Sequence, residues 1–391
     1  MILFEIVLIL AGAFYALMIC AFAVGFQRVR KQTYPSLSAD IPFVSVIVPA
    51  RDEGVFIKTC IDTIRANDYP PDRYEIIVVD DLSEDDTAEI VREIVSAQEP
   101  QFAPVRLLQM PENLERTRAH KKRAIEKGIS EAEGAIILTT DADCHVSTQW
   151  IRSMAGCFPD LQSPLTQPVT AFVSGPVLFR AGDHPLLHMQ ALEFLGLVSV
   201  GAGAIGAGRP TICNGANVAY RKDLFAKLGG FTGIDHLTSG DDELLMQKIA
   251  DTTPHHVRFN AEETAAVVTE PIHSFREFFQ QRKRWASKGA HYPNKGLIAM
   301  LLTVYLFYFG LLSGLVALTF FPAIWLAVMI GLGLKLIPEA LLLWPACRHF
   351  NRNWLFAYFL PEQLLHIPYI VVLGAAGALG KYEWKGRQIE R

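Results

Sequence analysis

Hydrophobic residues fill both ends of this 391-residue chain, whereas the middle mixes apolar and polar positions. Ile2–Phe26 is apolar except for Glu5, and the basic segment QRVRK (27–31) follows directly. A membrane span needs roughly 20 apolar residues, and a basic flank favours the cytosolic side. The alternative, a cleaved signal peptide, normally has its basic residues before a shorter apolar core. The observed order therefore predicts a transmembrane helix over residues 1–28.

A second apolar region extends over residues 297–380. Leu297–Phe321 and Ala323–Trp344 each reach spanning length, and Trp354–Leu379 either spans the membrane or re-enters it. The third stretch is irregular because it contains four interrupting residues: Pro361, Glu362, His366 and Pro368. We expect two or three helices here, and the side of the membrane on which the basic C-terminal tail lies stays open.

Two charged residues, Lys335 and Glu339, fall within the second of these stretches at helical i, i+4 spacing. Such residues can form an ion pair on one face of a helix. The pair could line a path for a lipid or a sugar, or it could hold neighbouring helices together. The sequence leaves both possibilities open.

Residues 43–270 have the pattern of one globular α/β domain. VSVIVPA (44–50) and EIIVVDD (75–81) are β-branched runs, typical of strands that are buried on both faces of a parallel sheet. The segment between them has apolar residues at helical spacing, so the three segments form a βαβ unit. Two further helices and two further strands follow, the last strand being AIILTTD (135–141). We therefore expect an α/β fold with a Rossmann-like, mostly parallel mixed sheet.

Acidic residues follow two of these strands. Asp80 and Asp81 end one strand, and Asp141 and Asp143 of the segment DAD follow the other. Ligands of such sheets bind beyond the carboxyl ends of the strands, so these acids should lie on one rim. Their carboxylates suit a hard divalent ion that keeps water ligands and takes phosphate oxygens.

A third acidic group, Asp241-Asp242-Glu243, stands at the start of a predicted helix, before LLMQKIA (244–250). Capping of the helix explains one of these acids. Three consecutive acids exceed what a cap requires, which makes one of them a candidate general base.

The segment QQRKRW (280–285) combines three basic residues with an indole. Such a group can hold a diphosphate by charge and a sugar ring by stacking. A basic amphipathic helix that rests on anionic lipid satisfies the same pattern, and both interpretations can hold at once. We expect an interfacial amphipathic helix over residues 271–292.

Composition and charge narrow the class of protein. Hydrophobic residues make up 51% of the chain and charged residues only 19%, so part of it should lie in lipid. A formal net charge of −4 argues against broad electrostatic contact with nucleic acid. The six cysteines are scattered without a CxxC pair, which indicates reduced thiols.

One motif is misleading. GAGAIG (201–206) matches the dinucleotide-binding pattern GxGxxG, but it lies deep in the domain and runs into Gly208-Arg209-Pro210. The genuine motif follows a first strand and opens a helix. We expect residues 194–207 to form a small-residue apolar surface near the membrane or near the site of an acceptor substrate.

In their order along the chain, these segments resemble the membrane-bound family 2 glycosyltransferases, which include cellulose, hyaluronan and ceramide glucosyl synthases. The pattern of that family is D, D, D, (Q/R)xxRW. Its counterparts here are Asp81, Asp141-Ala142-Asp143, Asp242 and Gln281-Arg282-Lys283-Arg284-Trp285. Supporting matches are VSVIVPARDEG (44–54), KKRAIEKGI (121–129) and NGANVAYRK (214–222). The resemblance implies a GT-A-type nucleotide-sugar-binding domain between N- and C-terminal transmembrane helices.

The resemblance also implies how the donor is bound. Asp81 would contact the uracil of a UDP-sugar, beside the backbone of Pro49 and Ala50. Glu53 and Lys121 would take part in binding the nucleotide-sugar.

Further roles concern the metal and the acceptor. Asp143 would bind Mg²⁺ or Mn²⁺ on the diphosphate, with Asp141 on the ribose or metal side. Asp242 would take the proton from the acceptor hydroxyl. The diphosphate and the acceptor would be contacted by four further residues: Asp241, Gln281, Arg284 and Trp285.

The implied activity is transfer of a sugar from a UDP-sugar to a membrane lipid by a single inverting displacement. The catalytic domain would be cytoplasmic, on a multi-pass protein of the inner cell membrane. A processive polysaccharide synthase that extends a growing glycan is the alternative, and a non-catalytic membrane scaffold is a third possibility. Nucleic acid is not an expected partner.

Four positions depart from the family pattern. Asp52 stands where Asn is frequent, His120 replaces the Gly usual before the matched Lys121, and Glu126 replaces a common Asn. In addition, GDD (240–242) stands for the more frequent xED. No carboxylate is lost by these changes, but the identity of the donor sugar stays open.

Overall fold

The structure is a computed structural model of the chain. It describes residues 1–34, 41–111, 119–235, 237, 240–287, 292, 294–379, 382–384 and 387–389. These residues form two compact units. The sheet unit comprises Gln27–Arg180 and Gly208–Glu270, and the helical unit comprises Met1–Phe26, Ala181–Ala207 and Pro271–Arg391.

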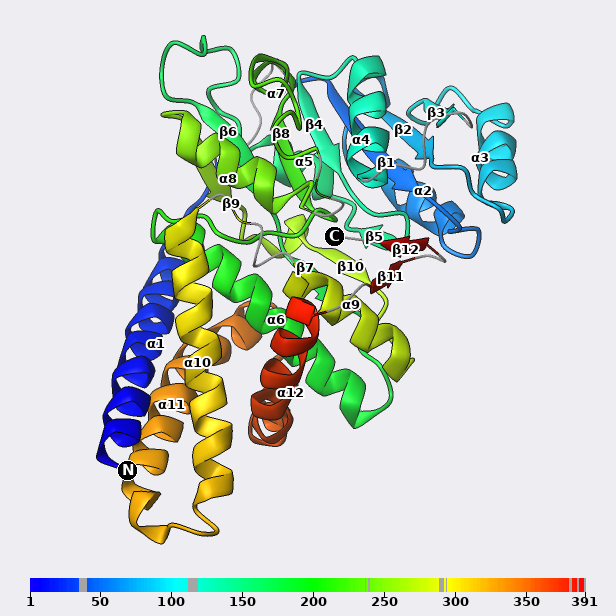
Figure 1. Cartoon of the computed structure of the whole chain (residues 1–391). Helices are drawn as coiled ribbons and strands as arrows, with labels where there is room; N and C mark the ends of the chain where they lie inside the picture. Colours follow the sequence, from blue (N-terminus) through cyan, green and yellow to red (C-terminus); the bar gives the residue numbers. More distant parts are fainter. Residues whose placement is uncertain are drawn as a thin grey trace. The chain divides into compact units, whose positions relative to one another are not determined.

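The main sheet of the sheet unit has the strand order β3-β2-β1-β4-β8-β6-β9 (Figure 1). Its strands are β1 (Val44–Ala50), β2 (Tyr74–Asp80), β3 (Val105–Gln109), β4 (Ile136–Thr139), β6 (Thr170–Ser174), β8 (Val218–Arg221) and β9 (His256–Phe259). β1 pairs in parallel with β2 and β4, and β2 pairs in parallel with β3. β8 runs antiparallel to β4 and β6, whereas β9 is parallel to β6. The predicted mostly parallel mixed α/β sheet is therefore confirmed.

The centre of this sheet is buried because its strands are apolar on both faces. All seven residues of β2 and six of the seven residues of β1 are buried. The helix α4 (His120–Glu131) packs on this strand pair. Gly128 permits the close approach, since a Cβ there would lie 2.7 Å from Cγ2 of Ile47. This packing fixes the first turn of α4 near the ends of the strands.

Smaller elements complete the sheet unit. A second sheet has the order β5-β10-β7 and consists of β5 (Cys144–Val146), β10 (Val267–Thr269) and β7 (Val177–Phe179). The helices, besides α4, are α2 (Ile57–Arg65), η1 (Pro71–Arg73), α3 (Thr87–Ser96), α5 (Trp150–Ala155), α7 (Lys222–Lys227), α8 (Glu243–Thr252) and η2 (Glu263–Ala265). The segment DAD therefore joins the main sheet, through β4, to the second sheet, through β5.

Five helical segments among the described residues are long and apolar enough to cross a membrane. They are α1 (Ile2–Val29), α6 (Pro185–Gly206), α10 (Lys295–Ala317), η4 (Pro322–Ile324) with α11 (Trp325–His349), and η5 (Asn353–Tyr358) with α12 (Phe359–Leu379). Within the helical unit, α1, α10 and α11 lie side by side (Figure 1): a Cβ on Gly12 would meet Phe307 and Leu334 at 2.8 and 3.0 Å. The irregular stretch near the C-terminus is a continuous helix from Phe359 that retains Pro368 in its interior.

The helix α6 was not predicted from the sequence. The predicted domain 43–270 includes it as part of the globular region, whereas its contacts group it with the helical unit. Its small residues serve close helix packing, because a Cβ on Gly203 would lie 2.3 Å from the carbonyl oxygen of Phe22 in α1. The GAGAIG motif thus lies inside a helix and does not form a nucleotide-binding turn.

The remaining elements of the helical unit are α9 (Phe275–Ser287), β11 (Tyr382–Trp384) and β12 (Arg387–Ile389). α9 falls within the range predicted for the amphipathic helix, and it packs against α12. At least one side of α9 is therefore covered by protein.

Candidate active site

The carboxyl ends of three neighbouring strands form the rim predicted from the sequence. Ala50 at the end of β1 pairs with Asp80 at the end of β2, and the N–H of Asp81 donates to the carbonyl of Ala50 at 2.9 Å. β4 pairs with β1 up to Thr139 and leads directly into Asp141. The order of parallel strands thus brings together acids that are 60 residues apart in the chain.

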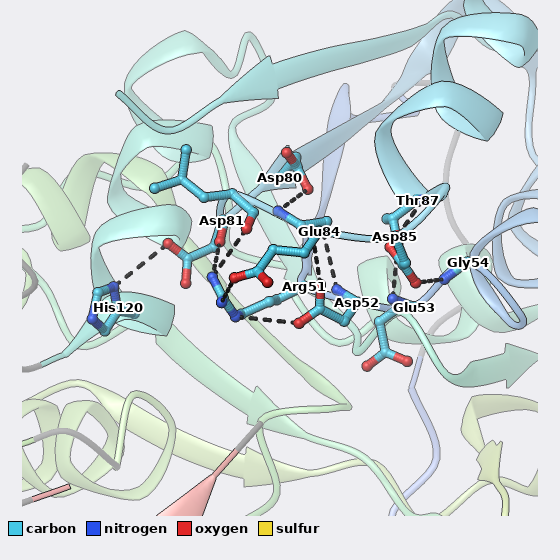
Figure 2. Close-up of polar contacts among 12 residues, drawn as sticks. Arg51, Asp52, Glu53, Gly54, Asp80, Asp81, Glu84, Asp85, Thr87 and His120 are labelled. Atoms are coloured by element: carbon cyan, nitrogen blue, oxygen red, sulfur yellow. Dashed lines mark hydrogen bonds and ion pairs between the residues drawn. The ribbon is translucent and has the colours of Figure 1, made fainter. Parts of the chain in front are cut away.

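A buried arginine holds the loop after β2 in place (Figure 2). The Nη1 of Arg51 donates to the carbonyl oxygens of Asp81, at 2.7 Å, and of Leu82, at 3.1 Å. The same guanidinium lies 3.4 Å from Asp52 and 3.5 Å from Glu84. Arg51 was not among the predicted site residues, although it directly follows the first strand. Its role is to fix the backbone from which the Asp81 side chain projects.

The two acids at the end of β2 have different surroundings (Figure 2). Asp80 is buried and accepts a hydrogen bond from the N–H of Ser83 at 3.2 Å, which closes the local turn. The carboxylate of Asp81 lies 3.5 Å from Nδ1 of His120, the first residue of α4. His120 was noted above only as a departure from the family pattern. It is a direct neighbour of Asp81, the acid predicted to contact the nucleobase.

Three residues next to this rim have a strained backbone conformation. Asp52, Leu82 and Ala119 have positive φ angles of 51°, 59° and 72°, which non-glycine residues rarely adopt. Each of them is adjacent in sequence to a rim residue described above. Such conformations persist where the surrounding structure enforces them, and they concentrate at functional sites.

Hydrogen bonds also order the loop that contains Glu53. Its N–H donates to the Thr87 hydroxyl at 2.7 Å, and the N–H of Gly54 donates to Asp85 at 2.9 Å (Figure 2). Partial burial alone would raise the pKa of Asp85, but hydrogen bonds from Thr87 and Gly54 bring it below its ordinary value. The Glu53 side chain itself remains half-buried at this edge.

Lys121 connects two of the predicted acidic segments. Its Nζ lies 2.7 Å from Oδ1 of Asp141 and 3.3 Å from Oδ2 of Asp241. Burial alone would lower the pKa of Lys121, but these two carboxylates raise it above its ordinary value. The lysine is therefore charged at neutral pH and stands between the DAD segment and the acidic start of α8.

Asp242 occupies the N-cap of α8. Its Oδ1 accepts from the N–H of Glu243 and its Oδ2 accepts from the N–H of Gly215, both at 2.7 Å. Gly215 lies close to both acids, since a Cβ there would lie 3.0 Å from the Asp241 carboxylate and 3.3 Å from Asp242. The Thr139 hydroxyl, at the end of β4, donates to the Gly215 carbonyl at 3.0 Å. Capping is thus a real role of Asp242, and each carboxylate oxygen keeps a lone pair for a proton.

The DAD segment provides a donor set that suits a divalent ion. The side chain of Asp141 is 36% exposed, and Asp143 is half-buried next to the Thr269 hydroxyl at 3.4 Å. The nearby thiols of Cys60 and Cys144 are buried, and burial raises their pKa, so they stay protonated and are poor metal ligands. Within the described ranges, no group of three or more His, Cys, Asp or Glu side chains could enclose a metal. Two carboxylates fit an ion such as Mg²⁺ or Mn²⁺ that completes its shell with water and phosphate oxygens.

The QxxRW segment lies on α9 of the helical unit. Gln281 accepts a hydrogen bond from Nη1 of Arg282 at 2.6 Å, and the Trp285 ring lies 4.2 Å from the Arg282 guanidinium. Arg284 is half-buried. The acidic residues belong to the other unit, so the roles of Gln281, Arg284 and Trp285 stay predictions.

Comparisons with known proteins agree with the predicted class. Residues 45–229 match the model of Glycosyl transferase family 2. The chain is 31% identical over 210 residues to glycosyltransferase AglE of Haloferax volcanii. The matched region covers 53% of this chain and 60% of that protein. It is 25% identical over 137 residues to beta-monoglucosyldiacylglycerol synthase of Trichormus variabilis, covering 35% and 28% respectively. The chain thus spans less than two thirds of the length of these relatives.

The fold is also found in a solved structure. Mannosyltransferase PcManGT from Pyrobaculum calidifontis, in complex with GDP-Man and Mn²⁺, superposes with a TM-score of 0.55 over 96% of this chain and 98% of that one, at 20% identity. The comparisons therefore support a family 2 glycosyltransferase domain with the predicted GT-A-like fold. The membrane-bound subgroup and the roles of the motif residues are not established by them.

Proposed function

We propose that this protein is a membrane-bound, metal-dependent glycosyltransferase that moves a sugar from a nucleotide-sugar to a lipid acceptor. The observation that carries this proposal is the group formed by Lys121, Asp141 and Asp241 at the same edge of the sheet as Asp81. It offers carboxylates for a metal ion and a fixed cation for a diphosphate. The match of residues 45–229 to a glycosyltransferase family supports the class of reaction.

The donor would bind along the ends of β1, β2 and β4. Asp81 would contact the nucleobase beside the backbone of Pro49 and Ala50, with Glu53 and Lys121 completing the nucleotide-sugar site. Asp141 and Asp143 would hold Mg²⁺ or Mn²⁺, which when bound neutralises charge on the leaving diphosphate. The motif resemblance favours uracil, whereas the solved structural neighbour holds a guanosine nucleotide.

The transfer itself would be a single displacement with inversion. Asp242 would accept the proton of the acceptor hydroxyl while the acceptor oxygen forms a bond to the anomeric carbon. The bond from that carbon to the diphosphate oxygen breaks, and the nucleoside diphosphate leaves with the electron pair. The diphosphate and the acceptor would be contacted by Asp241, Gln281, Arg284 and Trp285.

A lipid acceptor accords with the helical unit. Five segments of the described chain are long and apolar enough to cross a membrane, and one relative is named as a beta-monoglucosyldiacylglycerol synthase. We propose that the protein resides in the inner cell membrane with the sheet unit in the cytoplasm. A basic segment at residues 27–31, at the C-terminal end of α1, supports this orientation.

The test is a donor and acceptor screen with the full chain in native membranes. Radiolabelled UDP- and GDP-sugars would be supplied with Mn²⁺ or Mg²⁺, and the label would be followed into organic-phase and polymeric products. A short product in the organic phase supports the proposal, whereas a long water-soluble polymer supports a polysaccharide synthase. A protein that binds no nucleotide and transfers no sugar would contradict both and favour a scaffold.

A further inference from the structure

The basic segment of α9 contains one arginine that is buried. Arg282 is 3% exposed, whereas Lys283 and Arg284 on the same helix are half-buried. Removal of a guanidinium from water is costly unless its charge and its N–H groups find partners. The surroundings of Arg282 therefore indicate what this position is built to do.

The partners of Arg282 come from three helices. Its Nη2 forms an ion pair with the carboxylate of Glu193 on α6, and its Nη1 donates to Oε1 of Gln281 at 2.6 Å. The hydroxyl of Tyr369 on α12 donates to the other oxygen of Glu193 at 3.2 Å. One buried ion pair thus connects α9 to α6 and α12.

The same guanidinium also contacts the indole of Trp285. Its central carbon lies 4.2 Å from the Trp285 ring centroid and 4.8 Å from that of Phe278. Phe194, which follows Glu193 on α6, stacks on the indole with centroids 5.9 Å apart and ring planes at 27°. A planar guanidinium on an aromatic face is a favourable and directional contact. The indole is therefore in contact with an arginine from its own helix and a phenylalanine from a neighbouring one.

We infer that Arg282, with Glu193 as its counter-ion, is a positioning residue that fixes Trp285 and Gln281 for sugar transfer. The inference rests on the proposed function, in which both residues contact the diphosphate or the acceptor. Arg282 contacts both of these motif members. Loss of its side chain removes the hydrogen bond to Gln281 and the stacking partner of Trp285 at the same time.

The first experiment measures the position of the indole and requires no activity. The full chain in lipid nanodiscs is labelled with 5-fluorotryptophan, and the ¹⁹F resonance of Trp285 is assigned by its loss in Trp285→Phe. We expect this resonance to shift and broaden in Arg282→Met and in Glu193→Gln. The matched control is Arg276→Met, which removes the same charge from an exposed position of α9. An unchanged Trp285 resonance in Arg282→Met would overturn the inference.

The second experiment asks whether Arg282 acts through Trp285. In Arg282→Met we expect kcat/KM for the acceptor to fall by up to about 100-fold, since a misplacement of 1 Å can cost that much. The donor Kd should stay within about twofold of the wild-type value. Arg282→Lys keeps the charge without the planar stack, so its kcat/KM for the acceptor should lie between those of the wild type and of Arg282→Met. Thermal unfolding of each variant identifies any that fail to fold. If Arg282→Met is one of them, the kinetic comparison is made with Arg282→Lys.

A double variant gives the decisive result. If Arg282 acts through Trp285, then Arg282→Met combined with Trp285→Leu is no slower than the slower single variant. Losses that multiply would show that the two residues act independently and would overturn the inference. Failure of the wild-type chain to transfer any sugar would instead contradict the proposed function, and the ¹⁹F result would still decide the positioning.

Discussion

Two lysines, each held by carboxylates, illustrate opposite uses of charge in this molecule. Lys335 in α11 is fully buried, and its Nζ lies 2.9 Å from Glu339. Lys121 in the sheet unit lies 2.7 Å from Asp141, but its side chain is 23% exposed and that of Asp141 is 36% exposed. The distances are similar, and the access of solvent and ligand differs.

The ion pair of Lys335 and Glu339 is held by hydrogen bonds to side chains of neighbouring helices. The hydroxyls of Tyr15 in α1 and Tyr308 in α10 donate to Oε1 of Glu339 at 2.5 and 3.1 Å. Lys335 also donates to Gln363 of α12. Side chains from three other helices thus surround the pair, which favours the helix-packing role over a path for lipid or sugar. Around Lys121, in contrast, a diphosphate or a metal ion can replace one of the carboxylate contacts.

The largest effect is expected when the chemistry of the rim is removed without loss of its structure. Asparagine caps a helix as well as aspartate does, so Asp242→Asn should preserve α8 and donor binding. Its single amide oxygen keeps the cap on Glu243 and gives up the hydrogen bond from Gly215. It should lower the rate of transfer by about 10²–10⁴-fold, because an amide cannot accept the proton. Turnover in membranes and donor binding by calorimetry would be compared with those of Asp241→Asn, the adjacent acid. A greater loss in Asp241→Asn would assign the general base to that residue instead.

The next effect concerns stability and should be confined to the helical unit. Lys335→Met leaves Glu339 buried without its counter-charge, which typically costs about 3–5 kcal/mol. We expect a marked fall in the thermal unfolding temperature in nanodiscs. Lys335→Met with Glu339→Leu removes both charges and should recover much of the loss. A single variant that is as stable as wild type would show that the pair does not hold the helices together.

A smaller effect is expected when one metal-binding carboxylate of the rim is neutralised. Asp143→Asn should weaken nucleotide binding in the presence of Mn²⁺ by at least about tenfold, the range seen for groups that support a metal. Binding measured without metal should change little, because Asp143 would contact the donor through the ion. Calorimetry with and without Mn²⁺ separates the two contributions. An equal loss in both conditions would place Asp143 on the nucleotide itself.

The sequence predicted the rim better than it predicted the helical unit, for a physical reason. β-branched runs mark buried parallel strands, so β1 and β2 were located almost to the residue. The acids that follow β2 and β4 share one edge because both strands pair in parallel with β1. Helix α6 was missed as a candidate membrane helix because Gln190 and Glu193 interrupt its apolar pattern.

Contacts to backbone atoms, and contacts between residues far apart in the sequence, could not be predicted. Arg51 binds carbonyl oxygens of a loop 30 residues further along the chain, and no pattern of side chains predicts such a contact. The ion pair of Lys121 with Asp241 joins the first turn of α4 to the residues before α8, which are 120 positions apart in the chain. The buried state of Arg282 likewise follows from helices that are distant in the chain.

The smallest effect provides the reference for the comparison. Lys58 and Asp62 on α2 form an i, i+4 ion pair at 2.7 Å, the same distance as between Lys121 and Asp141, but their side chains are 64% and 49% exposed. Water screens such a pair, so Lys58→Met should change the free energy of unfolding by no more than about 0.5 kcal/mol. Denaturant titration of the full chain in detergent would measure this change, with nucleotide binding unaffected. If Lys58→Met proved as costly as Lys335→Met, distance and not enclosure would determine the strength of these pairs.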